Sequence, residues 1–211
     1  MLKSTKKHFV FDLDDTLTDS YDFNQQMFID TFIPYLDIDK TTESYLRKLH
    51  YHNRGVSMEL QFKKAINRFS LKYDPKILVK ENELLHIKNI EEIRIFESAL
   101  DLIKIIKNKG KQVSVVSNRQ MTSLKLIVNK NSLIKYVDNL ISCGDAGYDK
   151  PNPYCLNKLI AESNQPKNNF IFIGDSKTDS DFAKNAGIDF IIIDHYINQK
   201  KFYKLILQLF I

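Results

Sequence analysis

Short apolar runs alternate with stretches of helical periodicity near the start of the chain and throughout its second half. The runs that predict strands lie at residues 9–11, 113–116, 139–142, 170–173 and 190–193. Near-continuous apolar runs of this length are typical of strands covered on both faces, as in parallel sheets. The alternation predicts an α/β fold with a doubly wound parallel sheet, in which ligands bind at the carboxyl ends of the strands.

The helices predicted between these strands have recognisable ends. Gly110 and Gly187 are expected to stop two of them. Asn152 and Pro153 predict the start of another, as its N-cap and its first helical residue. The last stretch, residues 202–210, carries its apolar side chains on one face and predicts a helix that packs against the core.

Residues 19–95 break the alternation, because they contain helical signals and no convincing strand. The apolar stripes and helix starts lie at residues 28–32, residues 45–49, Ser57 and Asp74-Pro75. We therefore expect an α/β core formed by residues 1–18 and 96–211, and a small all-helical cap formed by residues 19–95. Because this insertion directly follows the first strand, it is expected to lie above the carboxyl end of that strand as a lid.

Composition and charge are those of an ordinary globular protein. Of the 211 residues, 43% are hydrophobic and 27% are charged, which argues against a disordered chain or a fibre. The formal net charge is +5, but the lysines are scattered, so we expect a solvated basic surface and no nucleic-acid partner. Neither a membrane span nor a signal peptide is evident, and we expect a cytoplasmic monomer or homodimer. Cys143 and Cys155 are expected to be buried thiols.

Two acidic clusters directly follow predicted buried strands. Asp12 and Asp14 are two residues apart, so an extended chain directs both side chains to the same side. Asp175 and Asp179 follow a second strand, and the carboxyl ends of parallel strands meet at one edge of the sheet. Carboxylates gathered there require a cation, and oxygen ligands favour Mg²⁺. A turn formed by the first cluster, and a helix-terminal role for Asp179, remain open alternatives.

Two further segments are candidates for phosphate binding. Ser117 and Asn118 follow a predicted strand and offer a hydroxyl and successive backbone N–H groups. Lys150 lies in a loop that two prolines stiffen, which would hold its ammonium group in one place. Each segment also has an ordinary interpretation: Ser117 and Asn118 could form a common turn, and Lys150 could be a solvated loop lysine.

These four segments, in this order, resemble the haloacid dehalogenase-like (HAD) superfamily of phosphohydrolases. A helical cap after the first core strand is similar to the phosphoglycolate phosphatase-like group of that superfamily. The resemblance implies a Rossmann-like core and a covalent mechanism. In that mechanism Asp12 is the nucleophile that becomes an aspartyl-phosphate, and Asp14 is the general acid and then the general base.

The resemblance also implies roles for the remaining candidates. Ser117 and the Asn118 backbone would bind phosphoryl oxygens, and Lys150 would neutralise charge near Asp12. The implied Mg²⁺ ligands are Asp12, Asp14 through its backbone carbonyl, Asp175, and Asp179 in a supporting position.

The function predicted from the resemblance is a magnesium-dependent phosphatase for a small phosphorylated metabolite. A sugar-phosphate mutase uses the same aspartates and remains an alternative, as does a non-catalytic binding protein. Asp14 argues against the dehalogenases and phosphonate hydrolases of the superfamily, which lack an aspartate at that position. Arg54, in a loop of the cap, is a candidate contact for a carboxylate or a second phosphate of the substrate, or a surface arginine.

Overall fold

The computed structural model describes residues 6–130, 132–193 and 204. Apart from residue 204, the helix predicted for residues 202–210 lies outside the described residues. A parallel five-stranded sheet forms the centre of the fold, in the order β5-β4-β1-β6-β7. Its strands are β1 (His8–Phe11), β4 (Gln112–Ser117), β5 (Asn139–Ser142), β6 (Phe170–Gly174) and β7 (Asp189–Ile192). The predicted α/β class and parallel sheet are confirmed.

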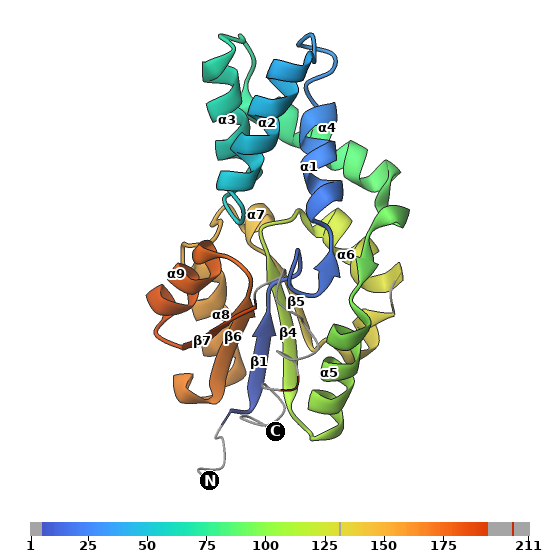
Figure 1. Ribbon diagram of the computed structural model, residues 1–211. Helices are drawn as coiled ribbons and strands as arrows, with labels where there is room; N and C mark the ends of the chain where they lie inside the picture. The colour runs from blue at the N-terminus through green and yellow to red at the C-terminus, as the bar shows by residue number, and fades with distance from the viewer. Residues whose placement is uncertain (1–5, 131, 194–203, 205–211) are drawn as a thin grey trace.

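Alternate residues of each central strand face opposite sides of the sheet, as the strand geometry requires. Phe9 and Phe11 pack into an apolar cluster with α5 (Glu97–Asn108) and α6 (Met121–Lys130), whereas Val10 packs with α8 (Tyr154–Ser163) and α9 (Lys177–Ala186). The two helix pairs cover the two faces of the sheet (Figure 1). Burial on both sides explains why these strands are apolar at successive positions.

Four helices form an insertion between β1 and the rest of the core. They are α1 (Tyr21–Asp30), α2 (Lys40–His52), α3 (Met58–Arg68) and α4 (Pro75–Lys88). Their stripes meet in a separate apolar cluster that includes Phe28, Phe32, Leu46, Phe62 and Leu78. Ser57 and Asp74 are the N-caps of α3 and α4, as predicted. The helical insertion stands above the carboxyl ends of the sheet strands (Figure 1).

Two short strands at the base of the insertion were not predicted. β2 (Thr18–Asp19) pairs with β3 (Arg94–Ile95) in an antiparallel ribbon, so the expectation of no strand near this boundary is wrong. Two residues are too few to show a period-2 pattern in the sequence. The ribbon brings the start and the end of the insertion together where the chain enters and leaves the core.

The predicted start of α8 is wrong by one residue. Pro153 is the N-cap, and the helix begins at Tyr154. The Asn152 side chain still contributes, because its Oδ1 accepts a hydrogen bond from the Tyr154 backbone N–H at 3.0 Å. The remaining elements are the short helix α7 (Cys143–Ala146) and the 3₁₀ turns η1 (Ile90–Glu92), η2 (Leu133–Tyr136) and η3 (Lys167–Asn169).

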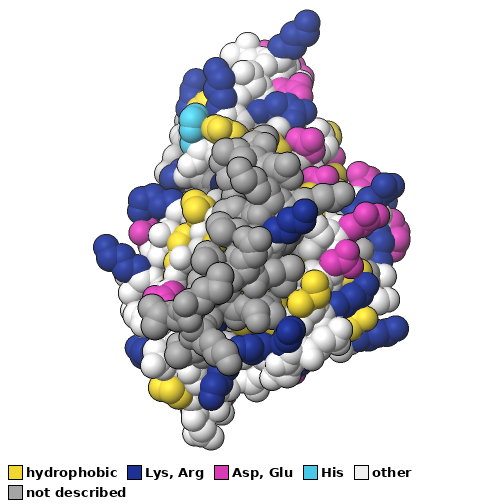
Figure 2. Space-filling view, turned by 60° about the horizontal axis from the view of Figure 1, so that its bottom comes forward, with side chains coloured by type: hydrophobic (Ala, Val, Ile, Leu, Met, Phe, Trp, Pro, Cys, Tyr) yellow, Lys and Arg dark blue, Asp and Glu magenta, His cyan; other side chains and the backbone are white. Residues whose placement is uncertain are grey.

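The surface away from the insertion carries mixed charge. On the part of this face that the structure describes, Lys and Arg side chains stand apart, with acidic side chains among them (Figure 2). Among the described residues, no helix combines the length and the apolar character that a membrane crossing requires. Both cysteines are buried free thiols, as predicted.

Candidate active site

A cavity of about 230 Å³ lies between the sheet and the helical insertion. Its floor is formed by the residues that directly follow β1, β4 and β6, and its roof by the loop between α2 and α3 together with parts of α3 and α4. Polar groups from the core and from the insertion therefore line the same cavity. Asp12, Asp14, Arg54, Ser117, Asn118, Lys150 and Asp175, all predicted site residues, line it.

Asp12 and Lys150 meet at the base of this cavity. Asp12 extends the β1–β6 pairing, because its backbone N–H donates to the Ile173 carbonyl at 2.9 Å. Lys150 Nζ lies 2.5 Å from Asp12 Oδ1 and 2.7 Å from Asp179 Oδ1. All three side chains are buried. Burial raises the pKa of Asp12, and Lys150 opposes that shift; the two carboxylates raise the pKa of Lys150.

The donor set beside Lys150 suits a hard divalent cation. Asp12, Asp175 and Asp179 each offer one carboxylate oxygen, and these oxygens lie within 4.8 Å of one another. Oxygen ligands grouped in this way are those that Mg²⁺ prefers. Burial, followed by the charge of Asp179, raises the pKa of Asp175 to about 6, and the charges of Arg54 and Lys150 oppose this shift. The Asp14 side chain is outside this group.

Asp179 also lies at the start of a helix. The helix-terminal role that the sequence left open for it is therefore observed, in addition to its place beside Lys150. Ser176, the N-cap of α9, and Asp179 form a capping box, in which Ser176 Oγ donates to Asp179 Oδ2 at 2.6 Å. Gly174 permits this packing, because a Cβ at that position would lie 2.6 Å from the Asp179 side chain. The helix cap thus holds the carboxylate at a fixed place beside Lys150.

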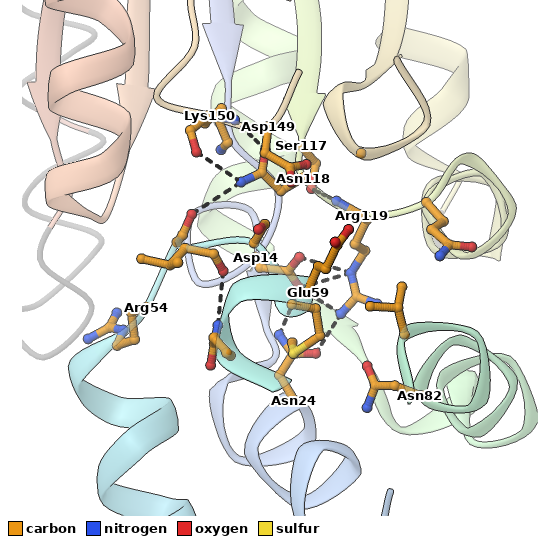
Figure 3. Close-up of a pocket in the computed structure, with 18 of the residues that line it drawn as sticks. Asp14, Asn24, Arg54, Glu59, Asn82, Ser117, Asn118, Arg119, Asp149 and Lys150 are labelled. Atoms are coloured by element: carbon orange, nitrogen blue, oxygen red, sulfur yellow. Dashed lines mark hydrogen bonds and ion pairs between the residues drawn. The ribbon is translucent and has the colours of Figure 1, made fainter. Parts of the chain in front are cut away.

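Asp14 is held by Arg119, on the side of the cavity nearest the helical insertion. Arg119 Nε donates to Asp14 Oδ2 at 2.9 Å, and Nη2 donates to Asp14 Oδ1 at 2.8 Å (Figure 3). Asn24 of α1 bonds to both partners, through Nδ2 to Asp14 and through Oδ1 to Arg119. Burial alone would raise the pKa of Asp14, but the charge and hydrogen bonds of Arg119, with further bonds from Asn24 and Ser20, lower it to about 2.

Ser117 and Asn118 lie at the end of β4, beside the cavity. The Ser117 hydroxyl accepts a hydrogen bond from the Arg119 backbone N–H at 3.1 Å. Asn118 Oδ1 accepts from the Lys150 backbone N–H at 2.8 Å, and its Nδ2 donates to the Gly55 carbonyl at 3.2 Å. The Asn118 side chain therefore links the lysine loop to the insertion, which leaves its backbone for the predicted phosphate contact.

Arg54 enters the site from the loop between α2 and α3. Its guanidinium lies 2.5 Å from Asp175 and 3.8 Å from Asp15, and it stacks over the Tyr21 ring at 5.5 Å. The neighbouring Gly55, with φ of 74°, allows the loop to approach the core, because a Cβ there would lie 2.6 Å from Ser176 Oγ. Arg54 is thus partly buried in the site, and the alternative of an ordinary surface arginine is not what the structure shows.

Sequence reasoning assigned no role to Arg119, Asn24 or Asp15. Arg119 directly follows the Ser117-Asn118 pair at the sheet edge where four carboxylates converge. Its positive charge at this place in the sequence could have indicated that it pairs with one of them. Asn24 had none, because its contact depends on how α1 stands on the core. Asp15 has a left-handed backbone, with φ of 59°, and burial and then Asp175 raise its pKa to about 8.

Comparisons with known proteins bear on the family and the fold of this chain. The family model described as haloacid dehalogenase-like hydrolase matches residues 9–193. Pyrophosphatase PpaX of Halalkalibacterium halodurans is 25% identical over 199 residues, which cover 89% of this chain and 83% of the relative. A Haemophilus somnus structure described as a predicted phosphoglycolate phosphatase has a TM-score of 0.77 at 17% identity, covering 93% and 92% of the two chains. A Thermotoga maritima structure provisionally described as a beta-phosphoglucomutase has a TM-score of 0.68 at 17% identity, covering 91% and 87%.

Proposed function

The chain belongs to the haloacid dehalogenase-like hydrolase family, as a phosphatase of that family, and on this premise we propose that it hydrolyses a small phosphorylated metabolite with Mg²⁺ and an aspartyl-phosphate intermediate. The observation that carries the proposal is the buried group in which Lys150 Nζ lies 2.5 Å from Asp12 and 2.7 Å from Asp179, with Asp175 beside them. A carboxylate that lines the cavity in such a position can act as a nucleophile, with its negative charge offset by the ammonium group.

In the proposed first step, the Asp12 carboxylate attacks phosphorus. A bond forms between Asp12 and phosphorus while the bond from phosphorus to the ester oxygen breaks, and Asp14 gives a proton to that oxygen. Ser117 and the Asn118 backbone bind the phosphoryl oxygens, and Lys150 offsets the charge that approaches Asp12. A Mg²⁺ ion held by Asp12, Asp175 and the Asp14 carbonyl, with Asp179 in support, would add positive charge beside the phosphoryl oxygens.

In the second step, Asp14 takes a proton from water as the water oxygen attacks phosphorus. Phosphate leaves, and the Asp12 carboxylate is regenerated. The contact with Arg119 favours the ionised form of Asp14, which is the form that a general base requires. The observed pair therefore suits the hydrolytic step. The first step requires Asp14 to leave Arg119, take up a proton from solvent and turn toward the ester oxygen.

The relatives support this substrate class. Their names, pyrophosphatase and phosphoglycolate phosphatase, both describe hydrolysis of small phosphorylated compounds. The likeness to the Thermotoga maritima protein, at 17% identity, concerns the fold alone. Hydrolysis is therefore the activity that we propose, rather than transfer between sugar positions.

Removal of divalent cations is expected to abolish hydrolysis of p-nitrophenyl phosphate. The reason is that Asp12, Asp175 and Asp179 would repel the substrate phosphate once their cation is withdrawn. Release of p-nitrophenolate should fall by at least about 100-fold in EDTA and return on addition of excess Mg²⁺. EDTA already saturated with Mg²⁺ is the control. Undiminished release after complete metal removal would contradict the proposed metal dependence.

A further inference from the structure

Arg119 presents a binding site for an oxyanion, and the Asp14 carboxylate occupies that site in the structure. Its guanidinium contacts both oxygens of the Asp14 carboxylate, through Nε at 2.9 Å and Nη2 at 2.8 Å. This paired geometry is the one with which arginine recognises carboxylates and phosphates. The Arg119 side chain is only 8% exposed, whereas that of Asp14 is 25% exposed. The carboxylate is thus the more accessible member of the pair, and it occupies an arginine that is fixed in place.

The position of Arg119 is on the leaving-group side of the site. Its backbone N–H bonds to the Ser117 hydroxyl, next to the predicted phosphate-binding segment. Its side chain then extends toward the insertion, where Nη2 donates to Asn24 of α1 (Figure 3). In the proposed mechanism Asp14 must reach the ester oxygen. The guanidinium group that holds Asp14 therefore lies close to the leaving group attached to that oxygen.

Two other cations in this cavity already have acidic partners deeper in the site. Lys150 lies between Asp12 and Asp179, and Arg54 pairs with Asp175. Arg119 is the cation that stands beside Asp14. A second anionic group, one or two bonds beyond the ester oxygen, would therefore meet Arg119.

We propose that Arg119 selects substrates whose leaving group carries a second oxyanion, a carboxylate or a phosphate, which replaces Asp14 on the guanidinium. This inference rests on the proposed phosphatase function. The replacement exchanges one oxyanion for another, so the buried guanidinium keeps a partner while Asp14 turns to the ester oxygen. A substrate with a neutral leaving group offers no replacement, and moving Asp14 would then leave a buried charge unpaired, which is costly.

Matched substrates test the inference. Phosphoglycolate and ethyl phosphate are both two-carbon phosphomonoesters, and only the first carries a carboxylate; ethylene glycol bisphosphate and ethyl phosphate form the corresponding pair for a second phosphate. The wild-type protein is expected to show at least about a tenfold higher kcat/KM for the anionic member of one or both pairs. Comparison of the two pairs tells whether the second oxyanion is a carboxylate or a phosphate.

Arg119→Gln should bring this ratio close to one, because kcat/KM falls more for the anionic member than for the neutral member. Arg119→Lys should retain part of the preference, since it keeps a positive charge without the paired donors. Arg54→Gln is the comparison variant, because it removes the other guanidinium from the cavity. The ratio of the two kcat/KM values does not change if part of the protein is unfolded, because both values fall by the same factor. If Arg119→Gln does not fold, Arg119→Lys is measured in its place.

The outcomes separate the two proposals. If the wild-type protein hydrolyses none of these esters, nor p-nitrophenyl phosphate, the proposed function fails. If it hydrolyses them without preferring the anionic members, the inference about Arg119 alone is overturned. The same conclusion follows if Arg119→Gln keeps the full wild-type preference, if Arg119→Lys keeps it undiminished where Arg119→Gln does not fold, or if the preference is lost only in Arg54→Gln.

Discussion

Asp12→Asn is expected to abolish phosphatase turnover while the protein remains folded. The amide has the size of the carboxylate, but it is a poor nucleophile and cannot form the aspartyl-phosphate. Removal of a catalytic nucleophile from a preorganised site costs at least about 10⁴-fold in kcat. Lys150 keeps its second partner, Asp179, at 2.7 Å in the variant, so the buried ammonium is not left without a carboxylate.

The measurement is the steady-state rate with p-nitrophenyl phosphate and Mg²⁺, accompanied by a thermal unfolding curve. Asp189→Asn is the matched control, because Asp189 is exposed at the amino end of β7, away from the cavity. It should retain the wild-type rate. Substantial turnover by Asp12→Asn would exclude a covalent mechanism through this residue.

Lys150→Met is expected to destabilise the protein as well as to inactivate it. The methionine fills a similar volume but leaves Asp12 and Asp179, both buried, without the ammonium group that contacts them at 2.5 and 2.7 Å. Breaking a buried ion pair from one side costs about 3–5 kcal/mol in free energy of unfolding. Loss of the charge that offsets Asp12 and the incoming phosphate should lower kcat by at least about 100-fold.

Urea unfolding in EDTA measures the stability effect without a metal ion that could replace the missing charge. Lys177→Met is the matched control, because Lys177 is exposed on α9 and pairs across the helix surface with Asp181. Its effect should be below about 0.5 kcal/mol. If Lys150→Met were as stable as Lys177→Met, Lys150 would not be the counter-charge of the buried carboxylates.

The fold was largely predictable, because the pattern that defines it is repeated along the chain. Each of the five sheet strands contains a short apolar run, and in β1 and β6 every position is buried, which favours apolar residues at successive positions. The ribbon of β2 and β3 was missed, since two residues per strand carry no periodicity. The start of α8 was misplaced, because Asn152 and Pro153 are each acceptable at more than one position of a helix start.

The sheet topology made it predictable that the aspartates meet at one site, whereas the ion pair between Asp14 and Arg119 was not predictable. Asp12 and Asp175 follow neighbouring parallel strands, so their meeting follows from the sheet. The spacing of Asp12 and Asp14 places Asp14 at the cavity but does not reveal its partner. That partner, Arg119, and their shared contact Asn24 depend on side-chain reach across elements and on the position of α1, which no local pattern encodes.

The most direct test of covalent catalysis by Asp12 uses Asp14→Asn with p-nitrophenyl phosphate. The p-nitrophenolate leaving group needs no proton, so the first step proceeds, but the base that activates water is missing and the intermediate should accumulate. Rapid mixing should give a burst of one equivalent of p-nitrophenolate per site, and the acid-quenched peptide that contains Asp12 should be heavier by one phosphoryl group. Slow release without a burst, with that peptide unmodified throughout, would contradict the account.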